Sequence, residues 1–155
     1  DRDGEIARGG TTNEELLERL NELDFYKQKG PKSLGREWVE EEVIPLIDSF
    51  NLKLEDRLST FCEHVAIQIG SNIKEGRVLL TGGGALNKYL VERMSKRAPQ
   101  CEYYVPDIMT VNFKEALIFA FLGALYIYDI PGCLKSVTGA KYDNIGGALY
   151  KAGQK

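Results

Sequence analysis

Apolar residues recur at steps of three and four along most of this chain, which predicts a helix-rich fold. A first helix is expected over residues 12–24, where Thr12 and Glu15 have the spacing of a capping box. The Gly30-Pro31 pair then stops helical structure and favours an extended link. A longer amphipathic helix is expected over residues 54–76, because its apolar positions keep the helical repeat.

Two short runs of β-branched, aromatic and leucine residues predict strands at residues 78–81 and 102–106. One helix, residues 87–97, separates them, so the strands are expected to pair in parallel as a right-handed βαβ unit. A last helix, residues 112–128, is apolar almost all round, which is typical of a helix buried between layers. Its longest apolar run, residues 116–128, is too short to cross about 30 Å of hydrocarbon. The pattern therefore predicts an α/β fold, rich in helices around a small parallel β core, with no membrane as partner.

Three consecutive glycines, Gly82, Gly83 and Gly84, stand between the first strand and the helix that follows it. Ligands of open α/β sheets lie beyond the carboxyl ends of the strands, and glycines let a ligand approach the backbone closely. The N–H groups at the start of a helix lack intrahelical partners and favour an anion. The pattern therefore indicates a nucleotide or another anion as ligand, or else a glycine-rich turn that binds nothing.

Two nucleotide-binding motifs fit this turn poorly. The dinucleotide fingerprint requires a glycine at the position of Asn87 and an acidic residue at the end of the second strand, whereas Glu102 begins that strand. The P-loop requires a Gly-Lys-Ser/Thr sequence, which does not follow the turn. Neither motif therefore accounts for the glycines.

The composition indicates a single globular domain over residues 1–155. Hydrophobic residues make up 43% and charged residues 28%, and a net charge of −3 without a basic block argues against nucleic acid as a partner. Three cysteines without paired spacing and a single histidine signal neither a disulfide framework nor a metal site, so a reducing cytoplasm is expected. The histidine, His64, stands beside apolar residues and is interpreted as a packed or surface residue rather than a ligand.

The chain opens with Asp1 rather than Met, and two parallel strands alone would leave open sheet edges. We therefore expect the chain to be a piece of a longer protein, with further strands upstream. The apolar last helix and the incomplete sheet also indicate a surface for a partner, and we expect a homodimer.

Two further groups of residues are candidate sites. Lys32, Ser33 and Arg36 lie in a loop that enters a helix, where they either bind an anion or leave Ser33 as a simple cap beside two solvated cations. Glu115 stands three residues after Asn112, so the pair has the spacing of a reciprocal cap at the start of the last helix. The functional alternative is that Glu115 displays its carboxylate near the ligand edge of the sheet.

The glycine turn and its flanks resemble the adenosine motif of the actin, heat-shock protein 70 and sugar-kinase superfamily. In that motif apolar residues and a small polar residue precede two glycines and further small residues, as in Leu-Leu-Thr-Gly-Gly-Gly-Ala at residues 79–85. The resemblance implies a partial ribonuclease H-like lobe of the actin-like ATPase type. It also implies that the turn supports adenosine and the nearby phosphate between two lobes.

Five blocks in matching order and spacing resemble the carboxyl-terminal half of the anhydro-N-acetylmuramic acid kinase family. They are residues 31–37, 81–90, 115–120, 131–132 and 136–140, so the resemblance covers essentially the whole chain. A single block of this kind has little specificity. Their common register is what identifies the family.

This resemblance implies an enzyme of peptidoglycan recycling that uses ATP and Mg²⁺. Such an enzyme opens the 1,6-anhydro ether of the cell-wall amino sugar with water and phosphorylates the released 6-oxygen. The residues implied to bind the adenosine side of ATP are Gly82, Gly83, Gly84 and Asn87. The residues implied to contact the sugar or to order the cleft are Glu115, Lys32, Ser33 and Arg36.

The resemblance also implies that the active site is incomplete in this chain. In the family the catalytic base is an aspartate in an Asp-Thr-Gly-Pro-Gly-Asn block, and this chain has neither that block nor the phosphate-binding turn of the other lobe. We therefore expect no catalytic residue and no metal ligand here, Mg²⁺ held mainly by the missing half, and no activity of the chain alone. The alternative is a non-catalytic binding or assembly module that keeps the sugar-kinase fold.

Overall fold

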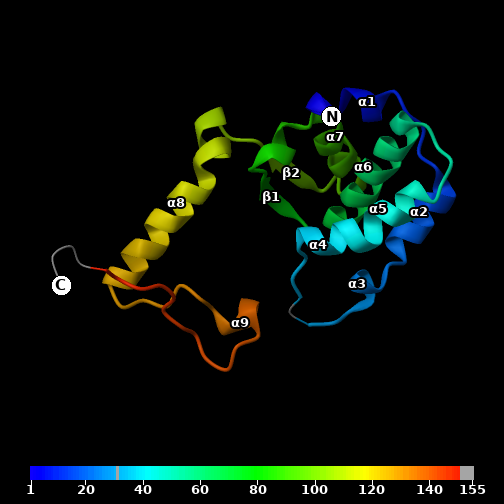
Figure 1. Cartoon of the computed structure of the whole chain (residues 1–155). Helices are drawn as coiled ribbons and strands as arrows, with labels where there is room; N and C mark the ends of the chain where they lie inside the picture. The colour runs from blue at the N-terminus through cyan, green and yellow to red at the C-terminus, as the bar shows by residue number, and fades with distance from the viewer. Residues whose placement is uncertain (31, 151–155) are drawn as a thin grey trace. The chain divides into compact units, whose positions relative to one another are not determined.

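The computed structural model of this chain shows an α/β structure, rich in helices, with a small parallel sheet (Figure 1). It describes residues 1–30 and 32–150. Pro31, which belongs to the expected stop after the first helix, and residues 151–155 lie outside the described residues. The expected fold class is confirmed at this level, and the ribonuclease H-like arrangement stays a prediction.

The chain divides into two compact units. The first unit consists of Asp1–Gln28 and Leu34–Asn112. The second unit contains the described residues of Lys29–Ser33 and Phe113–Lys155. The single domain expected over residues 1–155 stays a prediction.

The sheet of the first unit has two parallel strands, β1 (Gly76–Leu79) and β2 (Cys101–Tyr104). Both predicted strands and their parallel pairing are confirmed, although β1 begins two residues and β2 one residue earlier than the pattern predicted. The earlier start places Arg77 opposite Glu102, and their exposed side chains form an ion pair of 3.5 Å across the strands.

The central helix of the first unit is α6 (Leu54–Gly70). It is in contact with α7 (Lys88–Arg97), α1 (Glu5–Arg8) and α2 (Glu14–Asn21) (Figure 1). The predicted long helix is confirmed, but it ends at Gly70 rather than near Gly76. Because three helices surround α6, its side chains decide how the unit is assembled.

The capping residue of α2 is Asn13, one residue later than the predicted Thr12. The Oδ1 atom of Asn13 accepts a hydrogen bond of 2.9 Å from the backbone N–H of Leu16. The backbone N–H of Asn13 also donates to the hydroxyl of Thr60 on α6 at 2.9 Å, which ties the cap to the central helix. A short helix, α3 (Asp24–Lys27), follows α2.

One continuous helical stretch changes its winding twice, from α4 (Arg36–Trp38) through the π-helical segment η2 (Val39–Val43) to α5 (Ile44–Asp48). Pro45 lies at the start of α5 and has no backbone N–H to donate to the preceding turn. The wider π-helical turn before it accommodates the missing hydrogen bond. Val43 is buried and packs in the apolar core, which anchors this stretch there.

The apolar core joins α2, this stretch and α6. Its buried members are Leu16, Leu20 and Val43. The half-buried side chains packed around them are Leu23, Trp38, Val39, Leu46, Ile47, Phe50, Leu52 and Phe61. Full burial of one leucine contributes about 1.5–3 kcal/mol, so this cluster is a main source of stability in the first unit.

The last long helix, α8 (Ile108–Ile127), begins in the first unit and continues into the second. Asp107 lies immediately before it and accepts hydrogen bonds from the backbone N–H of Thr110 at 3.1 Å and from the Thr110 hydroxyl at 2.8 Å. The helix therefore starts four residues before Asn112. The predicted reciprocal cap between Asn112 and Glu115 is wrong, because Asp107 already satisfies the start of the helix.

Most of α8 is exposed, so the predicted burial between layers is wrong for the described chain. Val111 is its one buried residue, and 6% of its most apolar stretch is buried. With 20 residues, α8 is the one helix of the described residues that is long and apolar enough to cross a membrane, by length and composition only. The sequence expectation used the apolar run of residues 116–128 alone, which is shorter than the helix that the structure shows.

The tail after α8 is mostly loop. A short helix, α9 (Lys135–Thr138), ends at Gly139, whose φ of +71° lies in the left-handed region that favours glycine. Cys133 and Asn144 exchange two backbone hydrogen bonds, of 2.9 and 2.8 Å, in an isolated antiparallel bridge.

His64 on α6 is a packed residue within a polar network of the first unit. Its side chain is 1% exposed, with Nδ1 2.8 Å from Oδ1 of Asn21 and Nε2 2.9 Å from the hydroxyl of Tyr26. Burial lowers the pKa of His64 to about 4, so the imidazole is neutral at pH 7. In this state Nδ1–H donates to Asn21 and Nε2 accepts from Tyr26.

We predict that the free energy of unfolding falls as the pH is lowered from about 6.5 toward 4. The unfolded chain takes up a proton at His64 near pH 6.5, whereas the folded chain does so only near pH 4, so protons favour the unfolded state. Between pH 7 and 5 this group lowers the free energy of unfolding by about 2 kcal/mol. Urea titrations measure the slope, and His64→Gln should flatten it; equal slopes in both proteins would contradict the prediction.

Candidate functional site

The glycine turn leads from β1 to a single 3-10 turn, η3 (Gly83–Leu86), before α7 begins. Gly82 has φ of +78°, in the left-handed region where glycine is favoured. Gly83 and Gly84 have φ values outside that region, and a Cβ added at any of the three would meet no atom of the described chain within 4 Å. Neither backbone conformation nor packing therefore explains glycine at positions 83 and 84.

Two hydrogen bonds close the turn: the N–H of Ala85 donates to the carbonyl of Gly82 at 3.0 Å, and that of Asn87 to Gly84 at 3.1 Å. The first N–H groups of a helical turn have no acceptor inside it. The backbone N–H groups of Gly83 and Gly84 are therefore the donors that an anionic or polar ligand would meet here.

Asn87 is the N-cap of α7, and its Oδ1 accepts a hydrogen bond of 3.0 Å from the backbone N–H of Leu90. The helix therefore starts after η3 and not directly after the glycines, and its first turn already has an acceptor. A Cβ on Gly4 would lie 2.3 Å from the same Oδ1, so the amino-terminal segment packs closely on the cap. The predicted ligand contact of Asn87 would come from its Nδ2 amide.

The helix that follows the turn is held by buried polar groups of α6. The hydroxyls of Ser59 and Tyr89 lie 3.1 Å apart, and the Glu63 carboxylate accepts hydrogen bonds from both Arg93 and Arg97. Burial alone would raise the pKa of Glu63, but the two arginines outweigh it and hold the pKa below its usual range. These residues were not singled out in the sequence, because no local pattern pairs Glu63 with arginines 30 and 34 residues further along the chain.

The loop candidates are divided between the two units. Lys32 and Ser33 belong to the second unit and Arg36 to the first, and all three are exposed. Arg36 donates from Nε to Oε1 of Glu40 at 2.6 Å. The N-cap of α4 is Gly35, with no side-chain cap, so the capping alternative for Ser33 is wrong.

Glu115 is exposed on α8, in the second unit and away from the start of its helix. Its carboxylate is therefore not needed as a cap, and its predicted contact with sugar stays a prediction. No group of three or more His, Cys, Asp and Glu side chains within residues 1–30 and 32–150 could hold a metal ion.

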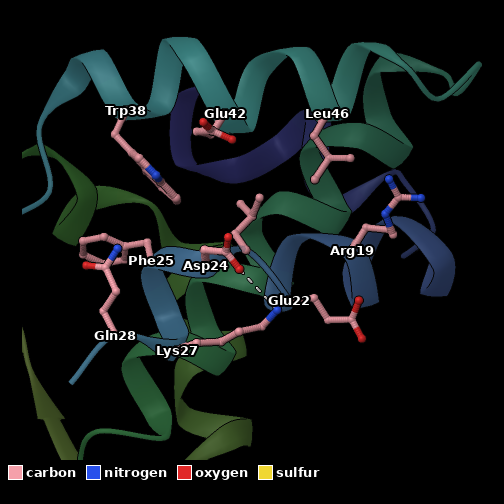
Figure 2. A pocket seen from close by; sticks show the side chains of 10 residues that line it. Arg19, Glu22, Asp24, Phe25, Lys27, Gln28, Trp38, Glu42 and Leu46 are labelled. Atoms are coloured by element: carbon pink, nitrogen blue, oxygen red, sulfur yellow. Dashed lines mark hydrogen bonds and ion pairs between the residues drawn. The ribbon is translucent and has the colours of Figure 1, made fainter.

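A cavity of about 600 Å³ lies elsewhere in the first unit (Figure 2). Trp38, Glu42 and Leu46 project into it from one helical stretch, opposite Phe25 and its neighbours. Its full lining is Arg19, Glu22, Leu23, Asp24, Phe25, Lys27, Gln28, Trp38, Glu42 and Leu46. No sequence pattern pointed to this cavity. Its charges have both signs and it shares no residue with the glycine turn, so it does not favour the expected anion.

A second cavity, of about 520 Å³, lies within the second unit. It is formed by the last turns of α8 and by the tail after Gly132, and no charged side chain lines it. Such a lining does not suit a phosphate group. The glycine turn therefore remains the candidate site for a nucleotide.

The sequence profile of one protein family matches almost the whole chain. The family is described as anhydro-N-acetylmuramic acid kinase, and the match covers residues 1–152. The matched region includes both strands, the glycine turn and α8.

Bacterial proteins named anhydro-N-acetylmuramic acid kinase are similar to this chain over almost all of its length. Relatives from Shewanella frigidimarina and from Pseudomonas syringae pv. syringae are each 34% identical over 98% of this chain. A relative from Vibrio parahaemolyticus is 31% identical over 97% of it. The chain spans 43% to 44% of the length of these relatives. It belongs to the anhydro-N-acetylmuramic acid kinase family.

Proposed function

We propose that the protein containing this chain is an ATP-dependent anhydro-N-acetylmuramic acid kinase. It converts 1,6-anhydro-N-acetylmuramic acid to N-acetylmuramic acid 6-phosphate, with hydrolytic ring opening, in peptidoglycan recycling. Support comes from the family match over residues 1–152 and from relatives that carry this name. The partners in this proposal are the amino sugar and ATP.

The proposed reaction needs groups beyond those of this chain. Water adds at the anomeric carbon and gives a proton to the base, and the bond from that carbon to O6 breaks. O6 then takes the γ-phosphoryl group of ATP, and ADP leaves. A carboxylate base must activate the water, and the phosphoryl charge must be stabilised by positioned donors and metal. The described residues include no cluster fit for Mg²⁺, and the sequence has no Asp-Thr-Gly-Pro-Gly-Asn block. We therefore assign the base and most of the Mg²⁺ site to the remainder of the protein.

To this chain we assign the adenosine side of the cleft, in a partial ribonuclease H-like lobe of the actin-like ATPase type. The observation that carries the assignment is the open space beside Gly83 and Gly84. Neither backbone conformation nor packing requires glycine at these two positions. Their backbone N–H groups would donate to the ligand, and the absence of side chains would let it approach. Asn87 would add its Nδ2 amide beside the turn, and Gly82 sets the direction of the chain.

The remaining assignments concern the sugar and the setting of the enzyme. The exposed carboxylate of Glu115 would accept hydrogen bonds from sugar hydroxyls, and Lys32, Ser33 and Arg36 would order the cleft. We propose a homodimer in the cytoplasm, without nucleic acid or membrane as partner. The net charge of −3 is the basis for excluding nucleic acid, the unpaired cysteines are the basis for the cytoplasm, and the exposed apolar surface of α8 is the basis for the homodimer.

A phosphorylation assay with 1,6-anhydro-N-acetylmuramic acid and ATP tests the proposal on the full-length protein and on residues 1–155 in parallel. We expect product from the full-length protein and none from residues 1–155, because the catalytic base lies outside this chain. Activity of residues 1–155 alone would contradict the assignment of the catalytic base to the remainder of the protein. A full-length protein that binds but does not phosphorylate would instead indicate a non-catalytic module.

Replacing Gly83 tests the glycine turn. In the full-length protein, Gly83→Ala, Gly83→Val and Gly83→Leu should raise KM for ATP progressively, by about tenfold or more for leucine, or about 1.4 kcal/mol of binding. The melting temperature should stay unchanged, because Gly83 is exposed and a Cβ at this position meets no atom of the described chain within 4 Å. An unchanged KM in all three variants would remove the assignment.

Replacing Glu115 by Gln tests the sugar contact. The Glu115→Gln variant of the full-length protein should raise KM for the sugar by about tenfold while KM for ATP changes by less than about twofold. The matched control is Glu41→Gln, since Glu41 is also exposed and lies on the π-helical segment. Equal kinetics in both variants would return Glu115 to an ordinary surface residue.

A further inference from the structure

We propose that Glu63 is a positioning residue for the glycine turn. By pairing with Arg93 and Arg97 it fixes α7 along α6, and with α7 the η3 turn that carries Gly83 and Gly84. The inference rests on the proposed function in one respect, since the turn is taken as the place where adenosine binds.

The contacts between α6 and α7 follow one another in a defined register. Ser59 meets Tyr89, Glu63 meets Arg93 and Arg97, and a Cβ on Gly70 would lie 3.2 Å from Cβ of Arg97. From one contact to the next the residue numbers rise in both helices, so α6 and α7 run in parallel. Three positions of α7, one turn apart, therefore face a polar and small-residue stripe of α6.

Burial makes the Glu63 contact selective for this register. The Glu63 side chain is 1% exposed, whereas those of Arg93 and Arg97 are 25% and 45% exposed. A carboxylate removed from water is unfavourable unless charged donors satisfy it. Because Arg93 and Arg97 lie one turn apart on α7, a shift of α7 by one helical turn, about 5.4 Å, would leave Glu63 with at most one of its two donors. The pairing thus disfavours other registers more than it adds to stability.

The position of α7 is passed directly to the turn. The last residue of η3 is Leu86 and the first of α7 is Lys88, so Asn87 alone separates them. Asn87 is itself held by its capping bond and by the close approach of Gly4. A displaced α7 would therefore displace the backbone of Gly83 and Gly84.

The chain offers a matched control on the same helix. Glu92 also bridges two cations, Arg8 at 2.6 Å and Lys96 at 2.8 Å, but its side chain is 40% exposed. Exposed ion pairs contribute little, because water and salt screen them. Glu92→Gln therefore removes one carboxylate charge and two ion pairs, as Glu63→Gln does, but from an exposed site rather than a buried one.

The test compares Glu63→Gln with Glu92→Gln in the full-length protein. Glu63→Gln should raise KM for ATP by about tenfold, with kcat and KM for the sugar within about twofold of the parent protein. The partly exposed arginines keep their hydration, which favours a folded variant. Glu92→Gln should leave all three constants within about twofold.

Two outcomes would overturn the proposal. One is an unchanged KM for ATP in a folded Glu63→Gln protein. The other is a fall in activity that follows the folded fraction alone, which would show a structural role only. If Glu63→Gln does not fold, Arg97→Gln replaces it, because it removes one donor of Glu63 at a side chain that is 45% exposed; an unchanged KM for ATP there would also overturn the proposal.

Amide hydrogen exchange of residues 82–90 without nucleotide separates this inference from the proposed function. Exchange should be about tenfold faster in Glu63→Gln than in the parent and unchanged in Glu92→Gln, because only the former releases α7. Absence of ATP-dependent activity in the parent protein would reject the proposed function and leave this readout intact. Equal exchange in Glu63→Gln and the parent would reject the positioning role.

Discussion

The ion pairs of Glu63 with Arg93 and Arg97 hold together the two helices on which the first unit is built. α6 contacts α1, α2 and α7, so a change in how α7 lies on it would alter the whole arrangement. Four of the five buried positions of α6 carry polar side chains, Ser59, Thr60, Glu63 and His64, and the fifth is Ala66. Among the described residues, every buried polar side-chain atom has a hydrogen-bond partner, so this polar interior is satisfied.

A polar interface of this kind has a different consequence from an apolar one. Apolar side chains tolerate small shifts along a helix, because their attraction has little direction. Hydrogen bonds and ion pairs have narrow geometry, and a buried charge without its partner is strongly unfavourable. In this protein Ser59 and Glu63 bond to α7, the helix that follows the glycine turn, whereas Thr60 and His64 bond to residues of the α2–α3 region.

The second unit follows the opposite principle. α8 is apolar almost all round and largely exposed, and an apolar cavity lies between its last turns and the tail. Large exposed apolar surfaces are unusual on monomeric proteins and mark surfaces that another layer covers. The chain spans 43% of the length of one relative, and the expectation of further structure beyond these residues stays a prediction. The partner surface predicted from the sequence stays a prediction.

Local sequence patterns were sufficient for the strands, the long helices and the position of the glycine turn. Helical spacing identified α6 and α7, and the glycines marked the end of β1, because these signals depend on neighbours in the chain. The same local rules misplaced caps. Thr12 and Asn13 are both residue types that cap helices well. Asn13 is the cap in the structure, and its backbone N–H also bonds to Thr60, 47 residues away.

The burial of Glu63 and His64 depended on the tertiary structure. The partners of Glu63 lie 30 and 34 residues further along the chain, and those of His64 lie 38 and 43 residues before it. No local periodicity encodes such pairs. The sequence therefore determined that a glycine turn lies between a strand and a helix. Only the tertiary structure decided that the glycines face open space and that a buried carboxylate holds the helix behind them, because both depend on atoms that folding brings together.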